Sequence, residues 1–172
     1  MKDTNTESRG KSCWGCETGL TLIEVIVVVA IVGVLATVAT LGFNRAIAHW
    51  ELLTAARTMV SDLRSARELA MTKGTDTVVW IYDYDDQEPY YMFEKSGGTW
   101  ESVYLPKRVQ FAHLSFFATI PSEVYKVQFG ASGTPSGQTG SAYLKNLSQS
   151  EYRRIAVMPV TGRVRITEEA PP

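Results

Sequence analysis

The chain has 172 residues, of which 45% are apolar and 20% are charged, and its formal net charge at pH 7 is −1. That length has room for one membrane helix and one globular domain of roughly 100–130 residues. A net charge so close to zero excludes a bulk polycation, so any binding to nucleic acid requires a local basic patch.

Residues 1–19 form a polar leader in which basic and acidic side chains balance. Both cysteines of the chain lie in this leader, as Cys13-Trp14-Gly15-Cys16. That spacing is typical of a redox pair or of half a zinc site, but no second pair of ligands lies nearby in the sequence. We therefore expect no metal or cofactor at Cys13 and Cys16.

Residues 25–44 contain no formally charged side chain over 20 positions, about the length that a helix needs to cross a bilayer. Glu24 stands at the start of this run. An ionised carboxylate inside a membrane segment costs about 2.5–3.5 kcal/mol on insertion scales, so Glu24 is a functional candidate. The alternative is that Glu24 lies at the headgroup boundary and marks only the start of the helix.

Ala46-Ile47-Ala48 has the A-x-A form of a secretory cleavage site, which leaves open a soluble domain released after Ala48. The apolar run is longer than the core of a typical signal peptide and begins beside Glu24, which favours a retained membrane helix. The basic residues of the leader are expected to keep it in the cytoplasm, so the chain after Phe43 is expected on the other side of the membrane.

The segment Gly19-Leu20-Thr21-Leu22-Ile23-Glu24, followed by the apolar run, resembles the class III signal of type IV pilins and type II secretion pseudopilins. In that family a prepilin peptidase cuts after the glycine and methylates the new N-terminus. The resemblance implies cleavage between Gly19 and Leu20, N-methylation of Leu20, and an assembly role for Glu24. Most relatives have Phe where this chain has Leu20, and its leader is longer than most. The cysteines would leave with the leader, so the exported domain would not depend on disulfides.

The same resemblance suggests a physical role for Glu24 in a filament. A carboxylate in the low-dielectric core of a helix bundle requires an opposite charge. The α-amino group of Leu20 on a neighbouring subunit would supply it. Because a misplaced subunit would leave both charges unpaired, this pair would favour the correct axial register.

The helix is predicted to continue beyond the membrane over residues 45–74. Apolar residues recur there with alternating spacings of four and three, which is typical of an amphipathic helix that packs on a domain. Gly74 after Lys73 predicts the end of the helix. The stripe consists of Leu52, Ala56, Met59, Leu63, Ala66 and Ala70.

From residue 75 to residue 172 the pattern changes to short strands separated by Gly, Pro and polar clusters. A hairpin turn is predicted at Ser96-Gly97-Gly98-Thr99. The fold class is therefore α+β, with a long N-terminal helix packed on a C-terminal antiparallel domain of one or two sheets. Strands are predicted at 77–82, 90–95, 99–105, 109–112, 114–118, 124–129, 142–145, 153–158 and 163–167.

Three C-terminal segments carry a second resemblance, to the GspH/FimT family of minor pseudopilins. They are Phe129-Gly130-Ala131-Ser132-Gly133, Arg154-Ile155-Ala156-Val157 and Gly162-Arg163-Val164-Arg165-Ile166. Strand alternation places Arg163 and Arg165 on one face, where they would contact successive DNA phosphates. Arg153, Arg154 and Lys145 are candidates for further contacts. The motif resembles the DNA-contact motif of FimT-type minor pilins. The alternative is a solvated edge strand protected by arginines.

An acidic segment and two histidines are candidates for other kinds of site. Asp83, Asp85, Asp86 and Glu88 have the oxygen ligands that calcium prefers, but their spacing matches no EF-hand, and the alternative is a solvated acidic turn. His49 and His113 stand outside any recognised Ser or Cys motif, so we expect no enzyme.

The two resemblances together imply a minor pseudopilin of a type II secretion or type IV pilus machine. It would be a single-pass protein of the inner membrane with a periplasmic domain, assembled at the tip of a filament for protein secretion. Its expected partners are other pilins and the prepilin peptidase. The alternative function is a minor pilin that binds double-stranded DNA during natural transformation.

Overall fold

The computed structural model describes residues 21–119, 123–137, 139–148 and 150–172, with the backbone alone at 38–42 and 117–119. The predicted leader, with Cys13, Cys16, Gly19 and Leu20, lies outside the described residues. The chain divides into two compact units, Met1–Thr40 and Leu41–Pro172.

Helix α1 runs from Leu22 to Lys73 and contributes to both units. Thr21 caps its start, because the Glu24 backbone N–H donates to Thr21 Oγ1 over 3.3 Å. The negative charge of Glu24 in the first turn also complements the helix dipole. The helix ends where the sequence predicts, with Gly74 in the left-handed conformation at a φ of 65°.

The first unit exposes apolar side chains on every side of the helix. Such a helix requires a cover of lipid or of other helices, since an isolated apolar surface of this extent is unfavourable in water. Within the described residues, however, no helical segment combines the length and the apolar character needed to cross a bilayer. The exposed residues are Leu22, Ile23, Val25, Ile26, Val27, Val28, Val29, Ile31, Val32, Val34 and Leu35.

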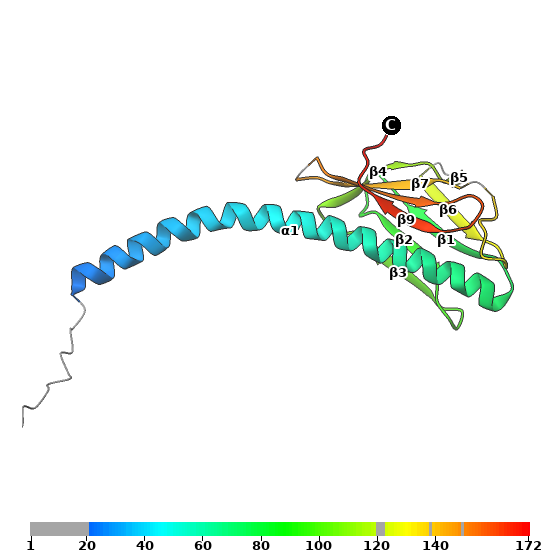
Figure 1. Ribbon diagram of the computed structural model, residues 1–172, viewed down its shortest axis with the longest axis horizontal. Helices are drawn as coiled ribbons and strands as arrows, with labels where there is room; N and C mark the ends of the chain where they lie inside the picture. Colours follow the sequence, from blue (N-terminus) through cyan, green and yellow to red (C-terminus); the bar gives the residue numbers. More distant parts are fainter. Residues whose placement is uncertain (1–20, 120–122, 138, 149) are drawn as a thin grey trace, which may run out of the picture. The chain divides into compact units, whose positions relative to one another are not determined.

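The second unit consists of the remainder of α1 and two antiparallel sheets (Figure 1). The first sheet has the order β3-β2-β1-β6-β5, and the second has the order β4-β7-β8-β9. These sheets confirm the predicted α+β class with a C-terminal antiparallel domain. The bounds are β1 Thr77–Tyr82, β2 Tyr90–Glu94, β3 Trp100–Tyr104, β4 Val109–Leu114, β5 Phe117–Thr119, β6 Val124–Phe129, β7 Ser141–Asn146, β8 Tyr152–Val157 and β9 Val164–Thr167.

The strands depart from the sequence prediction mainly at β4 and β5. The predicted strand at 109–112 continues to Leu114, and the next strand begins only at Phe117. A register shift between Phe111 and His113 in the β4–β7 pair accounts for this difference. A bulge of this kind lets a strand keep pairing past a point where its alternation of apolar and polar residues breaks.

The core lies between α1 and the two sheets. All six residues of the predicted stripe, from Leu52 to Ala70, are fully buried, which confirms the amphipathic second part of the helix. They share one cluster with Val79 and Phe129 of the first sheet and with Ile155 of the second. The stripe therefore holds both sheets to the helix, and each large side chain contributes about 1.5–3 kcal/mol by burial.

A buried polar contact adds a directional constraint to this core. Asn146 is fully buried at the end of β7, and its Nδ2 donates to the Ala48 carbonyl of α1 over 2.6 Å. Its Oδ1 accepts from the Ser148 backbone N–H over 2.8 Å. Because a buried amide is costly when unpaired, these bonds define the position of α1 along β7.

Candidate functional site

Glu24 lies in the first turn of α1, and its side chain is solvent-exposed in this single chain. The apolar residues on both sides of it are also exposed. In the single chain the Glu24 carboxylate is exposed to solvent. It would become buried if lipid or other helices covered the apolar surface around it. The geometry is therefore consistent with a group whose charge is matched only in an assembly.

The second candidate site is formed by Gly162 and β9. Gly162 has a φ of 63°, and its N–H donates to the Met158 carbonyl over 3.0 Å. A side-chain carbon at this position would lie 2.2 Å from the carbonyl oxygen of Gly133. The glycine of the Gly-Arg-Val-Arg segment is therefore required by its backbone conformation and by the close approach of a second loop.

The two arginines of this segment lie as the sequence predicts. Val164 is buried, whereas Arg163 and Arg165 on either side of it are exposed. β9 is an edge strand of the second sheet. Strand alternation has therefore placed both guanidinium groups on the solvent side of a sheet edge.

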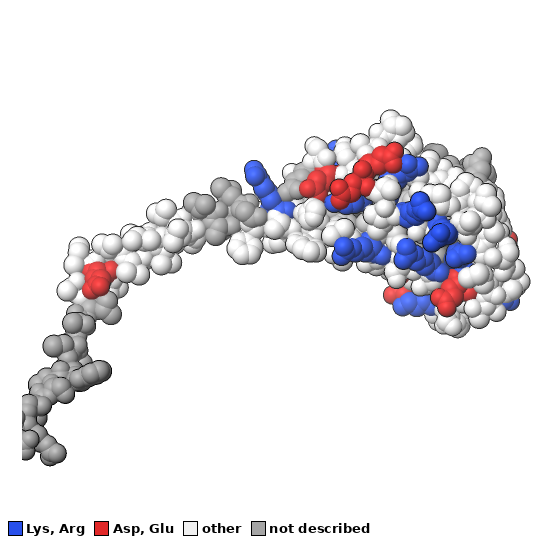
Figure 2. All heavy atoms as spheres, in the orientation of Figure 1, with Lys and Arg blue, Asp and Glu red and all other residues white. Residues whose placement is uncertain are grey.

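Sequence reasoning missed two further arginines that α1 brings to the same place. Arg64 Nη2 donates to the Val164 carbonyl over 3.2 Å, between Arg163 and Arg165 in the chain. Arg67 Nε donates to the Gly133 carbonyl over 2.8 Å and lies 3.1 Å from the position that a Gly162 side chain would occupy. Figure 2 shows basic side chains gathered where α1 and β9 lie in Figure 1.

We call Arg64, Arg67, Arg163 and Arg165 the arginine band. Within the described residues, none of the four forms an ion pair with a carboxylate. The two helix arginines are held in place by neutral backbone carbonyls, which use only part of the five N–H donors of each guanidinium. The band therefore presents ordered positive charge that no acidic side chain of the described chain neutralises.

The other basic residues considered from the sequence are engaged elsewhere. Arg153 is buried and pairs with Glu168 over 2.9 Å. Arg154 pairs with Glu169 over 2.7 Å, and this hydrogen bond raises the pKa of Arg154. Lys145 lies 6.0 Å from the ring centre of Tyr152. Arg153 is thus directed away from solvent, and Arg154 has a carboxylate partner.

The acidic turn does not form a cluster of ligands. Among the described residues, no three His, Cys, Asp or Glu side chains gather in a way that would hold a metal ion. Burial and the neighbouring Asp85 and Glu123 raise the pKa of Asp83. His49, which the sequence left without a partner, has its Nδ1 2.8 Å from Glu151 Oε2.

Replacing Gly162 with alanine is expected to destabilise the domain more than replacing Gly74. Both glycines have nearly the same φ, 63° and 65°, but only Gly162 faces a backbone atom at 2.2 Å, whereas Gly74 faces open space. Gly74→Ala should lower the free energy of unfolding by about 1–2 kcal/mol, because alanine is strained in the left-handed backbone conformation. Gly162→Ala should cost about 1–3 kcal/mol more through the steric conflict. Denaturant unfolding of both variants measures the difference, and equal losses would contradict the close approach of Gly133.

Comparison with known families shows that Glu24, the first candidate site, lies within a known motif. Residues 15–40 match the prokaryotic N-terminal methylation motif. This match includes the predicted cleavage point between Gly19 and Leu20 and also Glu24. The chain therefore carries the N-terminal methylation motif of prepilin-like proteins, which indicates a membrane-anchored N-terminus.

Solved structures provide two further similarities. The chain is 15% identical to the minor pseudopilin EpsH from the type 2 secretion system of Vibrio cholerae, with a TM-score of 0.48, covering 69% of this chain and 97% of EpsH. It is 16% identical to the type IV minor pilin FimU of Pseudomonas aeruginosa, with a TM-score of 0.46, covering 71% of this chain and 90% of FimU. A search of curated proteins finds no match. The N-terminal motif thus supports the type IV pilin and pseudopilin superfamily that the sequence resembles.

Proposed function

We propose that the chain is a minor pseudopilin that is cleaved between Gly19 and Leu20 and assembled at the tip of a periplasmic filament for protein secretion. The observation that carries this proposal is the methylation motif over residues 15–40. The helix that follows it supports the proposal, since it exposes apolar side chains all round and has one carboxylate in its first turn. This surface suits packing among other helices better than exposure to water.

The partners follow from the same features. The prepilin peptidase would act on the leader, and residues 20–44 would anchor the chain as a single pass in the inner membrane before assembly. Other pilins would cover the exposed helix surface from Leu22 to Leu35. The domain from Leu41 to Pro172 has its own core, and its role would be to present surfaces to partners in the periplasm.

Crosslinking in cells tests the assembly step. In a chain with Cys13 and Cys16 replaced by serine, single cysteines placed in the described part of α1 before Thr40 should form crosslinks to other pilin subunits when the peptidase is active. In cells without the peptidase these crosslinks should disappear, because the uncleaved leader would block entry into the filament. Crosslinks of equal yield in both cell types, or none in either, would contradict the proposed assembly.

The arginine band favours a second candidate function, the binding of double-stranded DNA. Four guanidinium groups from two elements lie around Val164 and Gly162, and two of them are held by backbone hydrogen bonds. Ordered arginines contact phosphates without reading the base sequence. This would suit a minor pilin that captures DNA during natural transformation.

Loss of Arg163 and Arg165 is expected to weaken DNA binding and its dependence on salt. Each lost phosphate contact lowers the slope of log K against log salt by about 0.9, so the double change to alanine should lower it by up to about 1.8. Adding Arg64→Ala and Arg67→Ala should lower it further. The matched control is Lys107→Ala/Arg108→Ala, which removes two charges near the opposite edge strand, β4. If the control lowers the slope as much as the β9 pair, the band is not the binding surface.

A further inference from the structure

Strand β3 is an edge of the first sheet, and within the described residues no further strand pairs with it. The hairpin that joins it to β2 defines which backbone groups point outward. Lys95 N–H donates to the Thr99 carbonyl over 2.8 Å, and Leu105 N–H donates to the Pro89 carbonyl over 3.0 Å. Because hydrogen-bonded pairs alternate along an antiparallel ladder, Trp100, Ser102 and Tyr104 direct their N–H and C=O groups away from β2.

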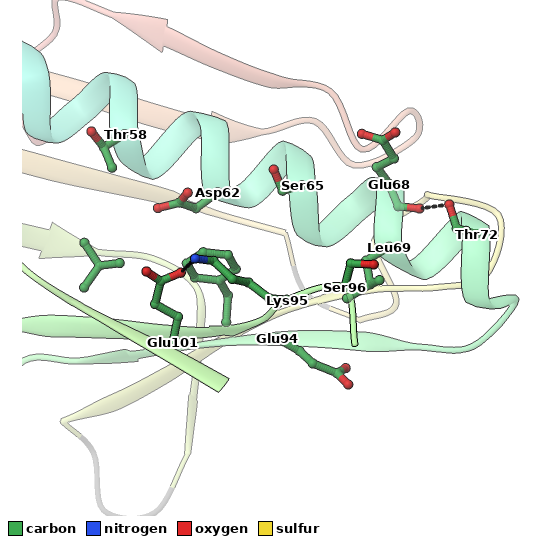
Figure 3. A pocket seen from close by; sticks show the side chains of 12 residues that line it. Thr58, Asp62, Ser65, Glu68, Leu69, Thr72, Glu94, Lys95, Ser96 and Glu101 are labelled. Atoms are coloured by element: carbon green, nitrogen blue, oxygen red, sulfur yellow. Dashed lines mark hydrogen bonds and ion pairs between the residues drawn. The ribbon is translucent and has the colours of Figure 1, made fainter. Parts of the chain in front are cut away.

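A groove of about 680 Å³ lies between α1 and the hairpin of β2 and β3. Figure 3 shows Asp62 pointing from α1 towards Lys95 and Glu101 on the hairpin. Glu101 and Val103 of β3 line the groove, whereas Trp100 and Tyr104 alternate with them and are exposed. A strand added to β3 would therefore place alternate side chains in the groove and on the outer face of the sheet.

The groove carries an excess of negative charge. Lys95 pairs with Glu101, and Lys73 pairs with Glu94 over 2.5 Å, whereas Asp62 forms no ion pair with a basic side chain of the described residues. Burial raises the pKa of Asp62 by more than the nearby charge of Lys95 lowers it. Asp62 accepts a hydrogen bond from the Tyr91 hydroxyl over 2.5 Å, and burial raises the pKa of Asp62. A basic side chain that entered the groove would lie between Asp62 and Glu101 and would offset this partly buried charge.

On the outer face of the first sheet, a row of aromatic rings ends at the edge strand β3. Tyr82 stacks on Tyr90 with ring centres 4.6 Å apart, and Tyr90 lies 5.1 Å from Tyr104. Tyr104, at the edge, is 60% exposed, and Trp100 of the same strand is 49% exposed. An aromatic residue on an added strand would continue this row, since cross-strand aromatic pairs stabilise sheets.

We propose that β3 accepts an extended segment of a partner protein as a sixth strand of the first sheet. The segment would alternate basic residues, which face Asp62 and Glu101, with aromatic residues, which stack beside Tyr104 and Trp100. Backbone hydrogen bonds to the outward groups of Trp100, Ser102 and Tyr104 would provide affinity, and the two faces would provide specificity. The surface shares no residue with Glu24 or the arginine band, so its test is independent of the proposed function.

The test uses the purified full chain in detergent and a synthetic peptide of alternating lysine and tyrosine. Fluorescence anisotropy measures binding, and hydrogen exchange reports on individual amides. We expect the peptide to protect the amides of Trp100, Ser102 and Tyr104. A peptide with the same composition in two blocks should bind at least about tenfold more weakly, because it cannot match both faces.

Two variants test separately how the backbone hydrogen bonds of β3 and the charge of Asp62 contribute to peptide binding. Ser102→Pro removes an outward N–H without touching the bonds to β2, and it should weaken binding by at least about tenfold. Asp62→Asn should weaken binding several-fold, whereas the charge-matched control Asp86→Asn should not. The proposal is overturned if the alternating peptide leaves the three amides unprotected, or if the block peptide binds as well. The amide readout uses the unaltered chain, so it decides the question even if Ser102→Pro fails to fold.

Discussion

Replacing Glu24 with alanine is expected to abolish incorporation of the chain into filaments while leaving leader cleavage and the β-domain intact. In an assembly the apolar surface around Glu24 would be covered, and the carboxylate would pair with the α-amino group of Leu20 on a neighbour. Removing one partner of a buried ion pair costs about 3–5 kcal/mol, which corresponds to more than about a hundredfold in association. The amount of the chain in sheared filaments, relative to the membrane fraction, measures the effect.

The control for this change keeps the charge. Glu24→Asp retains a carboxylate on a shorter side chain and should assemble better than Glu24→Ala, while Glu24→Gln, which has no charge, should behave like the alanine variant. The backbone N–H of residue 24 that donates to Thr21 Oγ1 is present in all three variants, so the Thr21 cap is not the variable. Filaments that contain Glu24→Ala at the normal level would contradict the assembly role of Glu24.

Replacing Leu63 with alanine is expected to lower the free energy of unfolding of the domain by about 2–5 kcal/mol. Leu63 is fully buried in the cluster that α1 shares with both sheets, so truncation leaves a cavity that neither sheet can fill alone. That loss is a large part of the roughly 5–15 kcal/mol by which domains are stable. Denaturant unfolding followed by tryptophan fluorescence measures it.

Leu147 provides the matched control, because it is 51% exposed and lies just after β7. Leu147→Ala makes the same chemical change at the surface and should alter stability by no more than about 0.5 kcal/mol. If Leu63→Ala and Leu147→Ala lower the free energy of unfolding equally, the second part of α1 does not pack on the sheets as described.

The regular part of the fold was predictable because periodicity reports burial. The stripe from Leu52 to Ala70 repeats with helical spacing, and each of its residues is buried. The strands at Thr77–Tyr82 and Val124–Phe129 have the predicted bounds because Gly, Pro or polar residues flank them. The alternation that exposes Arg163 and Arg165 follows from strand geometry alone.

The contacts between distant elements were not predictable from these patterns. Arg64 is not part of the apolar stripe, but only the fold shows that Arg64 meets Val164, a hundred residues away in the chain. In the same way, the need for glycine at position 162 depends on Gly133 of another loop. Arg153 and Arg154 are neighbours in a basic pair, and strand alternation buries the first and leaves the second nearer the surface. Local patterns indicate which side of an element is polar, and tertiary packing decides what it contacts.

The proposed processing is tested by the intact mass of the chain purified from cells with an active prepilin peptidase. We expect a mature chain that lacks residues 1–19, begins at Leu20 and carries one added methyl group on its α-amino nitrogen. Cells without the peptidase should retain the leader. A chain that begins after Ala48, or one that keeps the leader although the peptidase is active, would contradict the proposed cleavage after Gly19.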